Sequence, residues 1–143
     1  MLLTLLVASA FALVAQTDNP FVGKWVLNSA KSKYSPGPAP KSETVTIAED
    51  GNVVIEGISP QGKPFKWSYN SQSGDTVPIE GMENGTVSGK QAGNTVDHVW
   101  KTPTGNTTGH GVVSKDGKTM TYTQTGTGAE GHPIHSVVIF EKQ

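Results

Sequence analysis

Apolar and polar residues alternate along many short stretches of this chain, and after residue 20 no stretch predicts a helix long enough to cover a sheet. A period of two places successive side chains on opposite faces of a sheet, so the pattern predicts strands. The clearest stretch, residues 96–124, reads as three strands joined by loops at 103–105 and 115–117. Both loops end in glycine, which suits three-residue hairpin loops whose last residue is left-handed.

These two loops predict how the three strands pair. Closing the first loop pairs Thr102 with Asn106, and closing the second pairs Ser114 with Lys118. The large side chains then share one face and the small polar ones face water. The residues predicted to face inward are Val96, His98, Trp100, Thr108, His110, Val112, Met120 and Tyr122. In this register His98 lies opposite His110, which in turn lies opposite Tyr122.

Similar patterns occupy the rest of the chain. Residues 21–28 predict the first strand, and residues 28–42 form a proline-rich loop in which Asn28 or Ser29 caps one helical turn. Further loops at 49–51 and 60–62 predict that Val45, Ile55 and Trp67 lie side by side. Short strands are expected near 76–79 and 86–90, in a region whose register the sequence does not fix, and the last strand covers 134–142.

Consecutive antiparallel strands with one apolar face predict an all-β fold. An up-and-down antiparallel β-barrel of about 8–10 strands is favoured because closure removes exposed edges, and a two-sheet β-sandwich is the alternative. The side chains predicted to point into the barrel are Val45, Ile55, Trp67, Trp100, Val112 and Met120. A barrel of this size holds packed side chains or one small ligand.

Composition excludes several classes of protein. The 143 residues are 34% hydrophobic and include 17 glycines, which fits one small domain, and a monomer is expected. The formal charge of −1 comes from interspersed single charges, so no basic stripe is available to bind nucleic acid. The chain has no cysteine, which excludes thiolate zinc sites and thiol nucleophiles.

The N-terminal residues predict export. Residues 1–15 form an apolar run that is too short to span a bilayer and is followed by polar residues, as in a signal peptide. We therefore expect a secreted or periplasmic domain over residues 16–143, with no membrane span in the mature chain. A membrane anchor retained at the N-terminus is the alternative.

The segment Gly23-Lys24-Trp25, followed by a long loop and a meander of short strands, resembles the lipocalin-like (calycin) proteins. Residues 21–38 and 113–121 are also similar to small secreted bacterial proteins of this lipocalin-like kind. The resemblance implies an up-and-down barrel that binds small, mostly apolar molecules, and it implies no catalytic residues. Lipocalins set an arginine near the last strand against the tryptophan, and Lys142 is the nearest substitute here.

Polar and aromatic residues on the inward face are the candidate site. The predicted ligand-binding residues are Trp67, Tyr69, His98, Trp100, His110 and Tyr122. Paired across adjacent strands, His98 and His110 would have Cβ atoms about 5 Å apart, close enough for both imidazoles to bind one metal. Tyr122 would then add a phenolate, a supporting hydrogen bond or an axial ligand to haem. Alternatively, the histidines bond only to each other, to Tyr122 or to trapped water.

We therefore expect a binding protein for a small apolar or aromatic ligand, with no cofactor that the sequence identifies. The alternatives are a periplasmic inhibitor that acts through its proline-rich loop, a metal- or haem-binding barrel, and an isomerase or cyclase that uses the barrel as a reaction vessel. No motif for nucleophilic, phosphoryl-transfer or carboxylate-pair catalysis supports an enzyme. An interior too small for a benzene-sized molecule would favour the inhibitor.

Overall fold

Alternating residues form ten strands in the computed structural model, which describes residues 18–143. The elements are β1 (Gly23–Leu27), η1 (Ser29–Lys31), β2 (Ser42–Ile47), β3 (Asn52–Ile58), β4 (Pro64–Asn70), β5 (Val77–Pro78), β6 (Thr86–Ala92), β7 (Thr95–Thr102), β8 (Gly105–Val113), β9 (Thr119–Gly128) and β10 (Pro133–Lys142). The predicted signal peptide lies outside the described residues. Between residues 18 and 143, no helix has the length and apolar character needed to cross a membrane.

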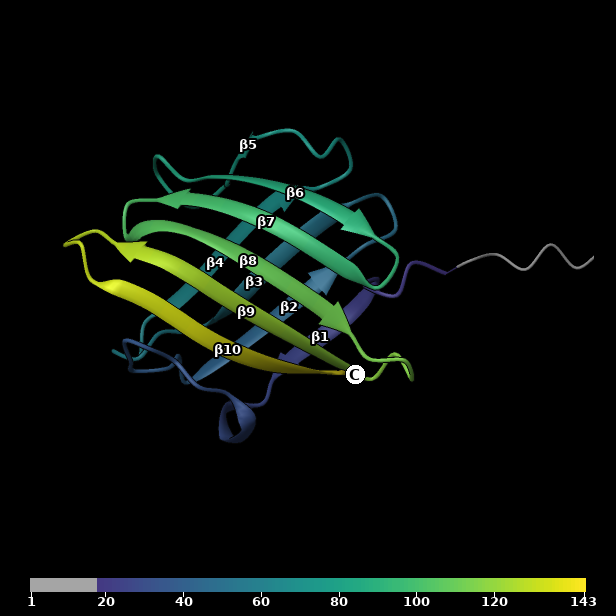
Figure 1. Cartoon of the computed structure of the whole chain (residues 1–143), viewed down its shortest axis with the longest axis horizontal. Coiled ribbons are helices and arrows are strands. Elements are labelled where there is room, and N and C mark those ends of the chain that lie inside the picture. The colour runs from purple at the N-terminus through teal and green to yellow at the C-terminus, as the bar shows by residue number, and fades with distance from the viewer. Residues whose placement is uncertain (1–17) are drawn as a thin grey trace, which may run out of the picture.

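All ten strands belong to one antiparallel sheet with the order β4-β3-β2-β1-β10-β9-β8-β7-β6-β5. The sheet curls so that its first and last strands approach each other, as Figure 1 shows. There Ser68 of β4 and Glu80, just after β5, exchange two main-chain hydrogen bonds of 2.8 and 3.1 Å. The predicted fold class is confirmed as a nearly closed up-and-down barrel.

The β2–β3 and β3–β4 hairpins have the predicted registers. Val45 pairs with Ile55, which pairs with Trp67 on its other side. Both loops hold three residues, and their glycines are left-handed, with φ of 86° at Gly51 and 84° at Gly62. Val45, Ile55 and Trp67 therefore face the interior, as predicted.

The predicted β7–β8 register is wrong by one residue. Thr102 pairs with Gly105 across a two-residue loop, so His98 lies opposite Gly109, and Asp97 lies opposite His110. A one-residue slip turns a strand over. The predicted inward residues Thr108, His110 and Val112 consequently lie on the outer face of β8.

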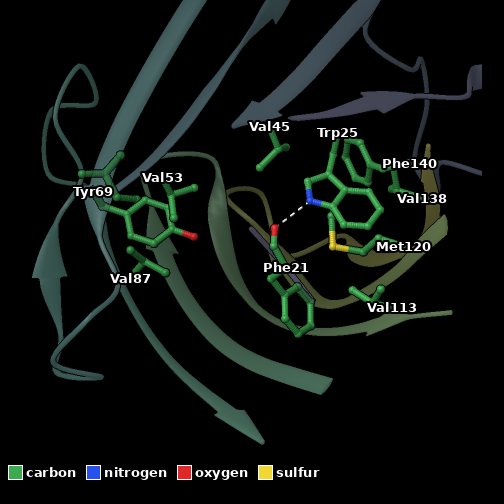
Figure 2. Close-up of a cluster of buried hydrophobic side chains, with 11 residues drawn as sticks. Phe21, Trp25, Val45, Val53, Tyr69, Val87, Val113, Met120, Val138 and Phe140 are labelled. Carbon is green, nitrogen blue, oxygen red and sulfur yellow. Dashed lines mark hydrogen bonds between the residues drawn. The ribbon is translucent and has the colours of Figure 1, made fainter. Parts of the chain in front are cut away.

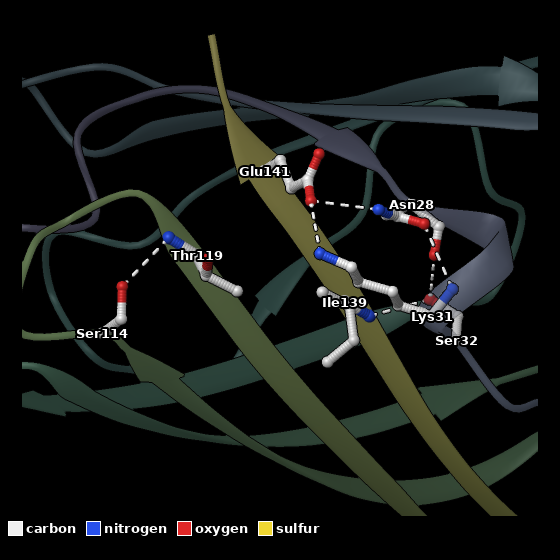
Figure 3. Close-up of polar contacts among 7 residues, drawn as sticks. All are labelled: Asn28, Lys31, Ser32, Ser114, Thr119, Ile139 and Glu141. Carbon is white, nitrogen blue, oxygen red and sulfur yellow. Dashed lines mark hydrogen bonds and ion pairs between the residues drawn. The ribbon is translucent and has the colours of Figure 1, made fainter.

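The predicted β8–β9 register is also wrong, because Ser114 closes on Thr119 around a four-residue loop. The Ser114 amide donates to the Thr119 carbonyl at 2.8 Å, and the Thr119 amide donates to the Ser114 hydroxyl at 3.0 Å (Figure 3). Asp116 orders this loop by accepting from the Ser114 hydroxyl at 2.6 Å. Met120 and Tyr122 still face inward, now opposite Val113 and Gly111.

One end of the barrel is closed by packed side chains. Trp25 is fully buried beside Phe140 and Met120, and its indole N–H donates to the Phe21 carbonyl at 2.8 Å (Figure 2). Lys142 of β10 extends across this end, with its ammonium 5.1 Å from the centre of the Trp25 ring. Lys142 therefore occupies the role that the resemblance gives to arginine.

The predicted helical cap at Asn28 is confirmed, and it fastens the proline-rich loop to the barrel. The Asn28 carboxamide oxygen accepts from the Lys31 amide at 3.1 Å, while its NH₂ group donates to Glu141 at 3.0 Å (Figure 3). Lys31 also pairs with Glu141 at 3.3 Å. The chain then continues along β10, where Lys33 and Val137 exchange two hydrogen bonds of 2.8 Å.

Candidate functional site

The barrel encloses a cavity of about 400 Å³. This volume falls in the usual range for small-molecule sites, and roughly 150 Å³ is already enough to hold benzene. Most of the lining is apolar or aromatic. The residues that line the cavity include Phe21, Tyr34, Glu43, Val45, Ile55, Trp67, Tyr69, His98, Trp100, Thr107, Tyr122 and Gln124.

A polar group at the cavity wall centres on Tyr122. The Trp100 indole N–H donates to the Tyr122 hydroxyl at 2.7 Å, and that hydroxyl lies 3.2 Å from Nδ1 of His98. Because an indole can only donate, the phenol accepts from Trp100 and has its own proton free for His98. When the phenol donates this proton, Nδ1 of His98 is the acceptor and the imidazole hydrogen lies on Nε2.

The members of this polar group are uncharged near neutral pH. Burial lowers the pKa of His98 to about 4, although the nearby Asp97 opposes the shift. Burial also raises the pKa of Tyr122 well above its ordinary value. The cavity therefore offers hydrogen-bonding groups on this side without a formal charge.

Glycines on the strands let the aromatic rings lie flat against the wall. A Cβ added at Gly109 would overlap the Tyr122 hydroxyl, and one added at Gly89 would lie 2.7 Å from the His98 ring. Gly111 pairs with Tyr122, and a Cβ added at Gly111 would lie 3.2 Å from the Tyr122 ring. These contacts explain why β8 turns Gly109 and Gly111 inward and His110 outward.

The facing wall is aromatic. Tyr69 meets Trp100 edge-on, with ring centroids 5.5 Å apart and an interplanar angle of 90°. Trp67 stacks on Phe65 at 4.8 Å. Such contacts hold the rings in fixed orientations around the cavity.

The structure brings five of the six predicted ligand-binding residues to the cavity, namely Trp67, Tyr69, His98, Trp100 and Tyr122. The sixth, His110, is exposed on the outer face, where its Nδ1 lies 2.6 Å from an Asp97 carboxylate oxygen. His98 and His110 therefore point to opposite sides of the sheet and cannot bind one metal as predicted. Within residues 18–143, no group of three or more acidic or histidine side chains could hold a metal ion.

Several polar residues of the cavity were not predicted from the sequence, and Glu43 and Tyr34 are the two that titrate. Burial raises the pKa of Glu43 to about 7. Burial and the neighbouring Glu43 charge raise the pKa of Tyr34 well above its ordinary value. The signal for Glu43 was present in the sequence, because it alternates in phase with the inward-facing Val45. Tyr34 lies in a loop, where alternation gives no facing.

Comparison with known proteins yields matches only at the level of structure. No family model matches the sequence, and no curated protein matches it. Among solved structures, fatty-acid-binding protein 1 of Echinococcus granulosus is 13% identical, with a TM-score of 0.55, and the match covers 86% of this chain and 97% of that one. The chain shares the β-barrel fold of that protein.

Two further barrels support this assignment. The wild-type fluorescent protein UnaG is 14% identical, with a TM-score of 0.54, over 86% of this chain and 97% of its own. The zebrafish ileal bile acid-binding protein complexed with cholic acid is 14% identical, with a TM-score of 0.52, over 87% and 99%. At these identities the likeness establishes the fold alone.

Proposed function

We propose that this protein binds a small apolar or aromatic molecule inside its barrel. The observation that carries the proposal is the cavity of about 400 Å³, enclosed by aromatic and aliphatic side chains. A barrel that served only as a rigid platform could fill this space with side chains, and filling it would improve packing. The volume is well above the benzene-sized limit that would have favoured the inhibitor.

The fold neighbours support the same class of ligand. They include proteins named for binding fatty acids and a bile acid, and one of these was solved with cholic acid. The shared barrel fold supports the proposal that this chain also binds its ligand inside the barrel.

The polar group of Trp100, Tyr122 and His98 would orient the ligand in the cavity. Trp67, Tyr69 and Trp100 would contact the apolar body of the ligand. The Tyr122 hydroxyl and the imidazole of His98 would bond to a ligand oxygen or nitrogen. No reaction step is assigned to these residues.

The proline-rich loop contributes to this site instead of acting as a free inhibitory segment. The Ser35 carbonyl accepts from the His135 amide at 2.8 Å, and Lys33 is bonded to Val137. Held between these two anchors, Tyr34 lines the cavity. The loop therefore serves as part of the wall.

We further propose that the chain acts after export, in the periplasm or outside the cell. The support is the apolar run of residues 1–15 in the sequence. An intact mass lacking these residues, measured on protein from its own host, tests this.

The binding proposal is tested by titrating N-phenyl-1-naphthylamine, an uncharged probe that fluoresces in apolar surroundings. Ile55 faces the cavity and Val54, its neighbour on β3, faces outward. Ile55→Trp fills the cavity and should weaken probe binding at least tenfold, by about 1.4 kcal/mol or more. Val54→Trp adds an indole outside and should leave binding unchanged. No binding by the wild type, or equal binding by both variants, would refute the proposal.

A further inference from the structure

We propose that the cavity selects a ligand that carries an ammonium group on an aromatic or aliphatic body, with Glu43 as the counter-ion. This inference rests on the proposed function and specifies its ligand class. It follows from the position of one carboxylate, the lining around it and the absence of positive charge.

Glu43 is an acidic residue facing an otherwise uncharged interior. It lies on β2, two residues before the inward-facing Val45, and lines the cavity. Its outward neighbour Thr44 pairs with Glu56, which forms an ion pair with Lys66 at 3.8 Å on the outer surface. Within residues 18–143 no hydrogen bond or ion pair reaches the Glu43 carboxylate, so it is free to pair with a ligand.

The described residues that line the cavity include no positively charged side chain that could form an ion pair with a ligand carboxylate. The sequence contains no arginine, and none of its lysines is among the described residues that line the cavity. The only imidazole in the lining, that of His98, is neutral near pH 7 because burial lowers its pKa to about 4. An anionic ligand would lose its hydration without gaining a counter-ion, and would be repelled by Glu43.

The aromatic lining complements a cation as well as an apolar body. Trp67, Trp100 and Tyr69 line the same space as Glu43, and Tyr34 lies close enough to Glu43 for the carboxylate to affect its pKa. Ring faces attract ammonium groups, most strongly where water is excluded. A partly buried carboxylate in a cavity lined by such rings can replace the hydration of a cation.

The protonation of Glu43 makes this selectivity depend on pH. Burial raises its pKa to about 7, so a bound cation would favour the carboxylate and release a proton. Of the titratable groups facing the same cavity, the tyrosines at 34, 69 and 122 remain protonated and His98 remains neutral between pH 6 and 8. The affinity for a permanent cation should therefore rise about tenfold from pH 6 to pH 8.

The test uses two ligands of equal shape that differ in charge. Benzyltrimethylammonium and its carbon isostere neopentylbenzene each displace N-phenyl-1-naphthylamine from the wild type at pH 6, 7 and 8. Affinity for the cation should rise about tenfold over this range while affinity for the isostere stays constant. Glu43→Gln should abolish the rise and weaken the cation about tenfold at pH 8, because the counter-ion is gone. Glu56→Gln, which removes an exposed carboxylate from the adjacent strand, should change neither result.

The failures of the two proposals are distinguishable. Probe and isostere binding without a pH-dependent preference for the cation would overturn the ammonium inference and leave the binding function intact. Tighter binding of dodecanoate than of the cation at pH 8 would overturn it as well. If neither the probe nor either ligand binds, the proposed function itself is wrong.

Discussion

His98 and Glu43, which both face the cavity, have pKa values shifted in opposite directions, and each shift affects stability in its own pH window. The pKa of His98 falls from 6.5 to about 4, so between these values the unfolded chain binds more protons and acidification destabilises the fold. The pKa of Glu43 rises from 4.5 to about 7, so in its window the folded chain binds more protons and acidification stabilises the fold.

These opposite effects predict a pair of variants with opposite pH profiles. Between pH 6.5 and 4.5 the two effects largely cancel in the wild type. His98→Gln leaves the Glu43 effect, so its free energy of unfolding should rise on acidification by about 1 kcal/mol per pH unit. Glu43→Gln leaves the His98 effect, so its stability should fall by a similar amount. Urea denaturation at several pH values measures both slopes, and parallel profiles for the two variants would contradict the burial of these groups.

For single residues, the sequence correctly predicts which side chains point into the barrel where large apolar residues alternate on β2, β3 and β4. Val45, Ile55 and Trp67 face inward as predicted. The registers expected from the loops at 103–105 and 115–117 predict that His110 and Val112 face inward, yet both lie outside. Gly109 and Gly111 occupy inward positions of β8 instead, because the Tyr122 ring lies where their side chains would be. A hydrophobic pattern cannot identify an inward face that is made of glycine.

At the scale of elements, the difference between the correct and incorrect hairpins lies in the loops. The loops that end in Gly51 and Gly62 have left-handed glycines and three residues, as the local sequence predicts. Gly105 instead opens β8, where an added Cβ would overlap the Thr127 carbonyl of the neighbouring strand. With a φ of 147°, this glycine begins a strand and leaves room for β9, whereas Gly51 and Gly62 end their turns, and the local sequence does not separate these two uses.

The side chain of Lys142 crosses the end of the barrel that Trp25 and its packed neighbours close. Gly23 leaves room for Lys142 to cross this end, because a Cβ at position 23 would lie 2.6 Å from Cε of Lys142. The ammonium group then lies over Trp25 and donates to the Pro20 carbonyl at 3.4 Å.

We predict that Lys142→Met lowers the free energy of unfolding by about 0.5–1 kcal/mol, because a chain of similar length remains but its charge over Trp25 is lost. Lys142→Arg keeps the charge and should stay within a few tenths of a kcal/mol of the wild type by the same reasoning. Urea denaturation followed by tryptophan fluorescence measures both. Equal stability of the methionine variant and the wild type would show that the charge contributes nothing at this end.

At the scale of the whole molecule, turn chemistry and alternation were sufficient to predict an up-and-down barrel of about 8–10 strands, because few architectures accommodate consecutive antiparallel strands with one apolar face. The cavity was not predictable in the same way. Its volume depends on how far the side chains of facing strands reach toward one another, which no local pattern specifies.

The central claim is that the barrel interior holds a small ligand, and native mass spectrometry of protein purified from its own host tests it most directly. We predict a second species heavier than the chain by the mass of one small molecule, which disappears on denaturation and is absent from Ile55→Trp but retained by Val54→Trp. A single mass equal to that of the chain alone, together with no uptake of N-phenyl-1-naphthylamine, would contradict the claim.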